Sequence, residues 1–141
     1  MCRDSIQSAI SVMPSLTNFG VGIYHNALGL ISDEARVKFE EEKLALLDSS
    51  ESFIKTVEWL KQIEKTEKFN ARLSSYGLKH VAEKDIGYIT NGVFIAAAIH
   101  SGFKYRIISD GPNVAFNMSQ KSLRKIENKQ YERMYKKRSL S

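Results

Sequence analysis

Residues 93–99 read Val-Phe-Ile-Ala-Ala-Ala-Ile, and no polar side chain interrupts them before His100. A helix that is apolar on all sides is stable in water only where neighbouring elements cover it. The stretch is far shorter than the roughly 20 residues that a membrane-spanning helix needs. It therefore predicts a central buried helix that begins near Thr90 and Asn91 and ends at Gly102, with small alanines that let its neighbours approach closely.

The segment before this helix carries the local signals of another helix. Ser74 and Ser75 are suited to its start, and apolar residues follow at helical spacing. Gly87 can adopt the left-handed conformation that closes a helix, so we expect the end around residues 85–87. The two helices together predict a buried helix pair.

The segment after the central helix changes its period and predicts a β-hairpin. Apolar and polar residues alternate over 103–107, turn-forming residues occupy 109–113, and a second apolar run covers 114–118. Because proline cannot donate to a strand ladder and glycine tolerates unusual backbone angles, we expect residues 110–113 to form an exposed tip. Residues 74–118 are thus predicted to hold the buried helix pair and the hairpin.

The N-terminal part is predicted to begin with an irregular segment. Proline and several glycines break up residues 1–31, so we expect little more there than a short helix near residues 4–12. Ser32 then has the position of a helix cap, with acidic residues in the first turn, and predicts a helix that ends near Leu47.

A second helix is expected directly after this one. Asp48 and Glu51 have the spacing of a capping box, and apolar residues at intervals of three and four follow as far as Ile63. The short junction at residues 48–50 favours an antiparallel helical hairpin within residues 32–72. Its charged outer face is typical of a solvated surface.

The basic charge of the chain is concentrated near its C-terminus. Residues 121–138 hold eight of the 21 Lys and Arg residues and two of the 16 Asp and Glu residues. Ser119 can cap a final helix over about residues 120–135, which would carry these cations and leave residues 119–141 as a basic helix and tail. Such a segment is a candidate contact for phosphates or an acidic protein surface, although lysines also serve solubility and the helix dipole.

The order of helix, turn, helix and hairpin is typical of a winged helix-turn-helix protein, in which the second helix enters the DNA major groove. That helix must expose polar side chains to read base edges, and residues 93–99 offer none. We therefore assign nucleic-acid contact to the last helix and to the hairpin, where Tyr105, Tyr131 and Tyr135 would suit a single strand or a backbone. The candidate binding residues are Lys104, Arg106, Arg124, Lys125, Arg133, Lys136, Lys137 and Arg138.

Composition and motifs narrow the class of protein. A chain of 141 residues with 43% hydrophobic positions fits one mainly α-helical domain, residues 1–141, with a small β-hairpin. Cys2 is the only cysteine, and residues 1–20 lack the pattern of a secretory signal, so we expect a reducing, cytoplasmic compartment and no membrane partner. No phosphate-binding or nucleophile motif occurs, and the pair His80 and Glu83 is weak support for a metal. We therefore expect no enzyme, no cofactor and no metal.

Four strings of residues carry a resemblance. They are Ser-Tyr-Gly-Leu-Lys-His at 75–80, Tyr-Ile-Thr-Asn-Gly at 88–92, Phe-Ile-Ala-Ala-Ala-Ile at 94–99 and Gly102-Phe103. Together they resemble a pattern in uncharacterised small accessory proteins of phages and conjugative or other mobile elements. The resemblance implies a genomic setting, and it brings no catalytic residues with it. Such a setting implies a regulator or DNA-handling factor, or an inhibitor of a host defence complex.

Three functional hypotheses follow. The leading one is a non-enzymatic accessory protein that binds nucleic acid through the basic C-terminal helix, and an uncharacterised enzyme comes third. The alternative between them is an anti-defence inhibitor, similar to anti-CRISPR proteins, that acts by protein–protein binding. A homodimer with the alanine-rich helix as its seam also stays open. The candidate partner surface consists of Tyr76, Lys79, His80, Thr90 and Asn91.

Overall fold

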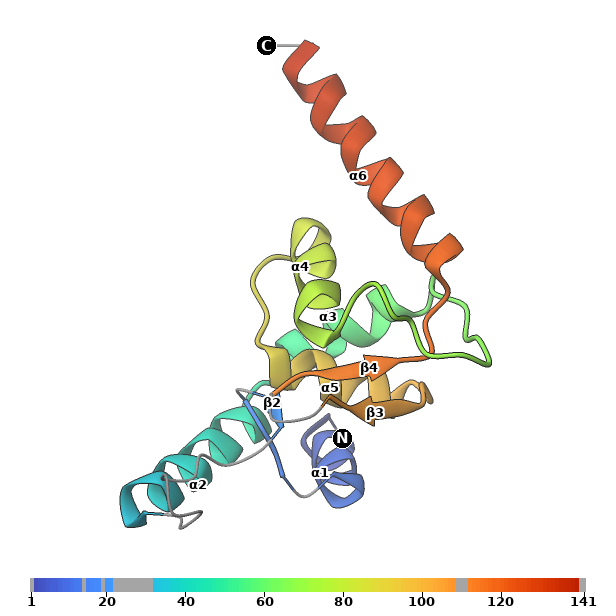
Figure 1. The fold of residues 1–141 in the computed structure, drawn as a ribbon. Helices are drawn as coiled ribbons and strands as arrows, with labels where there is room; N and C mark the ends of the chain where they lie inside the picture. Colours follow the sequence, from blue (N-terminus) through green and yellow to red (C-terminus); the bar gives the residue numbers. More distant parts are fainter. Residues whose placement is uncertain (1, 14, 19, 22–31, 109–111, 140–141) are drawn as a thin grey trace.

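A computed structural model describes residues 2–13, 15–18, 20–21, 32–108 and 112–139; the side chains of Cys2, Val21 and residues 137–139 lie outside the described part. The described residues form mainly helices, with two small antiparallel sheets (Figure 1). The helices are α1 (Cys2–Val12), α2 (Asp33–Leu47), α3 (Ser50–Leu60), α4 (Ser75–Ile86), α5 (Asn91–His100) and α6 (Gln120–Ser139). The strands are β1 (Leu16–Thr17), β2 (Gly20–Val21), β3 (Tyr105–Ile107) and β4 (Val114–Phe116).

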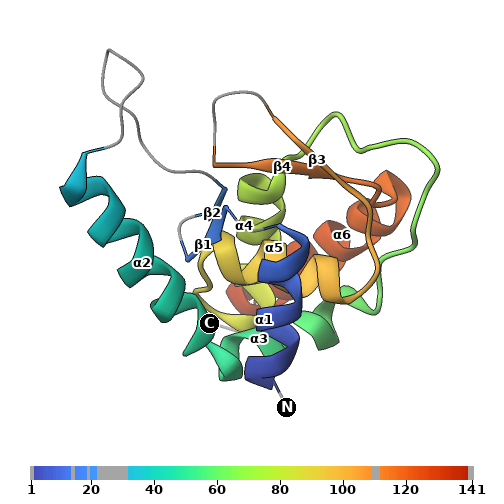
Figure 2. The same ribbon diagram turned by 90° about the horizontal axis from the view of Figure 1, so that it is seen from below.

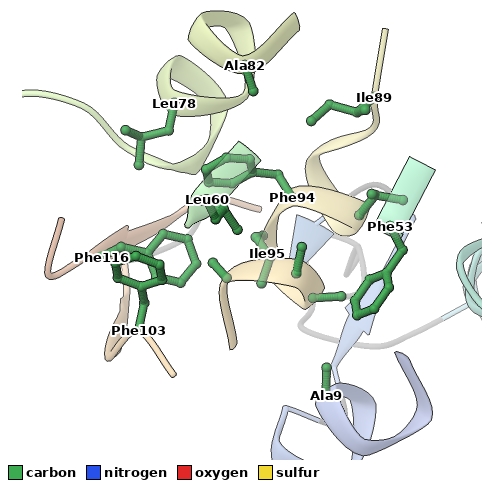
Figure 3. Packing of buried hydrophobic residues seen from close by; sticks show 14 of the residues in the cluster. Ala9, Phe53, Leu60, Leu78, Ala82, Ile89, Phe94, Ile95, Phe103 and Phe116 are labelled. Atoms are coloured by element: carbon green, nitrogen blue, oxygen red, sulfur yellow. The ribbon is translucent and has the colours of Figure 1, made fainter. Parts of the chain in front are cut away.

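Helix α5 lies at the centre of the molecule, as the apolar stretch predicts. Helices α1, α3 and α4 pack around it, and residues 91–98 are all buried. In Figure 3, Phe94 points from α5 towards α4, and Phe53 and Ala9 lie towards the other side of α5. Thr90 caps the helix, since its hydroxyl accepts a hydrogen bond from the Val93 amide at 3.1 Å. Residues 91–98, the alanines included, are therefore covered within one chain and are not exposed as a dimer seam would require.

The same burial does not support the winged helix-turn-helix interpretation. Helices α4 and α5 follow one another and precede a hairpin, but α5 is enclosed and cannot enter a DNA groove. Gly92 is part of the reason. A Cβ atom at this position would collide with the carbonyl oxygen of Thr17, because the start of α5 lies directly against β1. The small β1–β2 hairpin thus closes the N-terminal end of α5, and the residue pattern did not predict it.

Strands β3 and β4 form the predicted hairpin, with Tyr105 paired to Phe116 and Ile107 to Val114. The expected exposed tip is partly wrong. Asp110 and Gly111 lie outside the described residues, but Pro112 and Asn113 are half-buried. The Asn91 side chain donates hydrogen bonds to the Pro112 carbonyl at 3.2 Å and to Asn113 Oδ1 at 2.9 Å, so this end of the turn is attached to α5.

The predicted antiparallel packing of residues 32–72 is not observed. Helix α2 packs on β1 and α1, whereas α3 packs on α5, α1 and α4, and in Figures 1 and 2 the two helices diverge from their junction. Ser32 caps α2 as predicted. Asp48 ends α2, and its amide donates back to Leu44, so it does not open α3, whose cap position is Ser49. Helix α3 also stops at Leu60, before the expected Ile63.

Helix α6 begins in the body of the molecule and then leaves it (Figure 1). The Ser119 hydroxyl accepts from the Ser122 amide at 3.1 Å, which confirms the predicted cap. Leu123 and Ile126 are buried, and the helix packs on α4. The helix ends at Ser139, four residues beyond its predicted end. Over the part of the chain that the structure describes, no helix combines the length and apolar character needed to cross a bilayer.

Candidate nucleic-acid interface

The face of α6 that points away from the body carries lysines at regular intervals. Lys121, Lys125 and Lys129 follow one another at steps of four, and Lys136 continues the same face two turns later. All four are exposed, and none takes part in an ion pair among the described side chains. Glu132 lies on this face as well and offsets one charge. The arrangement is a cationic strip along a helix of about 30 Å.

The predicted nucleic-acid residues occupy two separate places. Arg124, Lys125 and Lys136 are exposed on α6. Lys104 and Arg106 are exposed on and beside β3, in the hairpin from which the chain leads into the base of α6, and the Arg106 guanidinium lies 5.2 Å from the Phe69 ring centroid. Lys137 and Arg138 belong to α6 by their backbone, but their side chains lie outside the described residues.

Arg133 differs from the other predicted cations because it is already engaged. Its guanidinium pairs with Asp85 at the end of α4. Asp85 Oδ2 also accepts hydrogen bonds from Trp59 Nε1 at 2.7 Å and from Gln130 Nε2 at 2.9 Å. The Gln130 amide donates in addition to the Val81 carbonyl at 2.8 Å. Helix α6 is thus attached to α4 and α3 through one carboxylate.

The charge state of Asp85 follows from these contacts. Burial alone would raise the pKa of its carboxyl, but the hydrogen bonds from Trp59, Gln130 and Arg133, together with the Arg133 charge, outweigh burial. The pKa of Asp85 is therefore below its ordinary value. Asp85 is ionised at neutral pH, and Arg133 serves first as its counter-ion.

Two tyrosines lie beside the cationic strip where α6 has left the body. The rings of Tyr131 and Tyr135 stack with centroids 6.3 Å apart and planes inclined by 23°. Both residues are more than 60% exposed, and Met134 next to them is 54% exposed. The end of α6 thus combines aromatic surface with positive charge.

The predicted partner surface forms a second candidate site. Tyr76, Lys79, His80, Thr90 and Asn91 all line one open cavity of about 1010 Å³ between α4, the start of α5 and the end of the hairpin turn. Tyr88, which is 78% exposed, lies on its rim. Sequence reasoning therefore brought together residues that the fold also brings together.

Lys79 fixes the floor of this cavity. It is 6% exposed, and its Nζ donates to Glu83 Oε1 at 3.0 Å and to the Ile89 carbonyl at 3.1 Å. The rings of Tyr88 and Tyr76 lie 5.0 and 5.6 Å from this ammonium group, at distances typical of cation–π contacts. A buried charge with these partners holds the structure together and is not a free cation for a ligand.

His80 is an exposed polar side chain of the cavity. Its Nδ1 lies 2.8 Å from Glu83 Oε1, and its ring meets the Tyr76 ring edge-on at 4.5 Å. Glu83 thus orients the imidazole. Within residues 2–13, 15–18, 20–21, 32–108 and 112–139, no three potential metal ligands of the His, Cys, Asp or Glu type come together.

No protein-family model, curated protein or solved structure matches the chain. The resemblance to accessory proteins of mobile elements stays a prediction.

Sequence reasoning missed several residues of the candidate interface. Lys121 and Lys129 were counted in the basic segment but not chosen, and their spacing of four from Lys125 could have identified them. Asp85 and Trp59 gave no such signal, because they are 48 and 74 positions away from Arg133. Only the folded chain brings these residues to α6.

Proposed function

We propose that the chain binds nucleic acid through the cationic strip of α6, formed by Lys121, Lys125, Lys129 and Lys136. The proposal rests on one observation: four exposed lysines lie on one face of a helix that leaves the body of the molecule. Phosphates along a nucleic-acid backbone release counter-ions when such cations neutralise them. Lysine contacts of this kind position a protein on the backbone without reading base sequence.

The concentration of positive charge on one helix supports the proposal. The basic residues are concentrated on one element, since residues 121–138 hold eight basic and two acidic residues. A helix of about 30 Å can follow several successive phosphates. Lys104 and Arg106 on the hairpin are candidates for an additional backbone contact.

The test replaces the four lysines of the strip by glutamine and measures filter binding to a 20-base-pair duplex across a salt series. For duplex DNA the slope of log affinity against log salt is about −0.9 for each phosphate contacted. We expect the variant to bind more weakly to every sequence and its slope to flatten by up to about 3.6. The fold, measured by circular dichroism, should be retained because all four side chains are exposed.

A matched control carries the same change of charge elsewhere. Arg36, Lys38, Lys55 and Lys61 are exposed on or next to α2 and α3, and their replacement by glutamine should leave the slope near that of the parent protein. If the α6 variant and the control bind alike, or if the parent protein shows no salt-dependent binding, the proposal is wrong.

A protein partner at the cavity is the second candidate function, as expected of an inhibitor of a host defence complex. The observation that favours it is the convergence of Tyr76, His80 and Tyr88 on one rim, with all three side chains more than half exposed. The test is co-purification of a stoichiometric complex after nuclease treatment. Tyr88→Ser should lose the partner, and Leu44→Ser, an exposed apolar residue of α2 outside the cavity, should keep it.

A further inference from the structure

The distal segment of α6, residues 131–136, has no buried side chain, and Arg133 connects it to the body through Asp85. Leu123, Ile126 and Gln130 are buried against the body, whereas residues 131–136 are exposed. Short isolated helices are marginal in water, and helical stability in proteins comes mostly from packing of an apolar face. An exposed apolar surface is formed here by Tyr131, Met134 and Tyr135. A molecule bound to this surface would stabilise the helical segment.

Charge decides which occupant fits this surface. Residues 129–138 hold five basic residues and one acidic residue. In a dimer formed through this surface, the basic residues of one copy would lie next to the basic residues of the other. Electrostatic repulsion between them would oppose the helix pair. An anionic strand neutralises the same charge. The surface therefore fits a nucleic acid better than a second copy.

The two rings decide which form of nucleic acid fits. Tyr131 and Tyr135 are stacked, more than 60% exposed, and separated by one helical turn, about 6 Å along the axis. Bases inside a duplex are stacked on one another and show only their edges in the grooves. Unpaired bases offer their faces, and aromatic side chains beside a basic groove bind them with little sequence preference.

We propose that the nucleic acid bound at α6 is single-stranded, with Tyr131 and Tyr135 stacking on unpaired bases while the neighbouring lysines contact the phosphates. This inference rests on the proposed function and specifies its ligand. Arg124, seven residues before Tyr131, is exposed on the same face of the helix as the rings, and Lys136 follows Tyr135 about 100° around the helix, so cations flank the rings on the path of a bound strand.

The experiment compares three probes: a 20-nucleotide oligothymidylate, an abasic strand of the same length, and a 20-base-pair duplex. The variant is Tyr131→Leu combined with Tyr135→Leu, which keeps apolar volume and good helix propensity but removes the rings. We expect its affinity for oligothymidylate to fall by about fivefold to a hundredfold, with an unchanged salt slope. Its affinity for the abasic strand and for the duplex should stay within about twofold of the parent protein, because neither probe presents an unpaired base to the rings.

Several results would overturn the inference while leaving the proposed function standing. They are a parent protein that binds the duplex at least as tightly as oligothymidylate, and a tyrosine variant that binds all three probes like the parent. The glutamine variant of the cationic strip separates the two questions, since it should weaken binding to all three probes. If instead the parent is a dimer by sedimentation without nucleic acid and the tyrosine variant is a monomer, a second copy occupies the surface and the inference is wrong.

Discussion

Asp85 connects three elements through a single side chain. It accepts hydrogen bonds from Trp59 of α3 and Gln130 of α6, and it pairs with Arg133 of α6. Hydrogen bonds to a charged group contribute more to stability than neutral ones. If the carboxylate were removed, its donors would stay shielded from water without an acceptor, which costs further free energy. This carboxylate therefore holds α6 at its angle to the body.

We expect Asp85→Asn to lower the free energy of unfolding at pH 7 by about 2 kcal/mol, because the neutral amide has one acceptor oxygen: if that oxygen accepts from Trp59 and Gln130, the NH2 group faces the Arg133 guanidinium and the ion pair is lost. The control is Glu58→Gln, which removes an exposed ion pair with Lys61 and should cost about 0.5 kcal/mol or less. Urea unfolding followed by circular dichroism measures both. Equal stability of the two variants would show that the Asp85 contacts contribute little.

The same carboxylate makes the stability depend on pH. Because the pKa of Asp85 is lower in the folded state than in the unfolded chain, its contribution is complete above the ordinary Asp pKa and is lost as pH falls through the folded value, below about pH 4. The parent protein should therefore lose more stability than Asp85→Asn between about pH 5 and pH 2. Parallel acid limbs for the two proteins would contradict this.

Helix α5 depends on close approach as much as on apolar burial. The Gly92 amide donates to the Asn18 carbonyl at 3.2 Å, and the Cα atom of Asn18 would lie 2.7 Å from any Cβ at position 92. Backbone atoms cannot yield as a side chain can. The helix and the β1–β2 hairpin therefore fit together only with glycine at this position.

We expect Gly92→Ala to destabilise the protein by about 2 kcal/mol or more, since the forced shift outweighs the better helix propensity of alanine. Gly77 of α4 is the matched control, because its Cβ would meet only the flexible end of Leu73 at 2.9 Å. Gly77→Ala should stay within about 1 kcal/mol of the parent. Thermal unfolding of both variants gives the comparison, and a Gly92→Ala protein as stable as Gly77→Ala would contradict the expected collision.

Elements with strong local signals were predictable, and their packing was not. Caps at Ser32, Thr90 and Ser119 and the closing Gly87 act within a few residues of themselves, so sequence alone located the helices that they bound. Asp48 shows the limit of that reasoning. It has the spacing of a cap for α3, but α2 extends into it, and nothing local decides between the two roles.

The candidate sites show the same division. The five cavity residues come from α4 and the start of α5, which a short loop connects, so positions close in sequence stay close in space. The engagement of Arg133 by Asp85 joins positions 48 apart and depends on how α6 leaves the hairpin. Periodicity could not predict the packing angle of α6. It therefore could not predict that Arg133 is paired with Asp85.

The molecule consists of a body that contains the hydrophobic core and a helix, α6, whose distal part projects from it. The core cluster takes its residues from every helix, and its α6 members are Leu123 and Ile126 near the start of that helix. The distal segment contributes charge and aromatic surface in place of core (Figure 1). Stability and the proposed nucleic-acid binding should therefore be separable.

We expect a chain truncated after Met134 to keep its fold, with a Tm within about 3 °C of the parent, because Leu123, Ile126 and the Arg133–Asp85 pair remain. The truncation removes Tyr135 and Lys136, so its affinity for oligothymidylate should fall at least tenfold if α6 binds a single strand as inferred. Thermal melting and filter binding on the same sample separate the two effects. A large drop in Tm would place the distal segment in the folded core instead.

Trp59 is the only tryptophan in the chain, and its indole N–H is bound to the carboxylate that holds α6. Its intrinsic fluorescence therefore reports on the contact between α6 and α4 at Asp85 without any attached dye. If a ligand pulls the end of α6 away from α4, Arg133 leaves Asp85, and the field and hydrogen bond felt by the indole change with it. With excitation near the red edge of protein absorption, where the six tyrosines do not absorb, the emission of Trp59 would then follow the movement of α6 in real time.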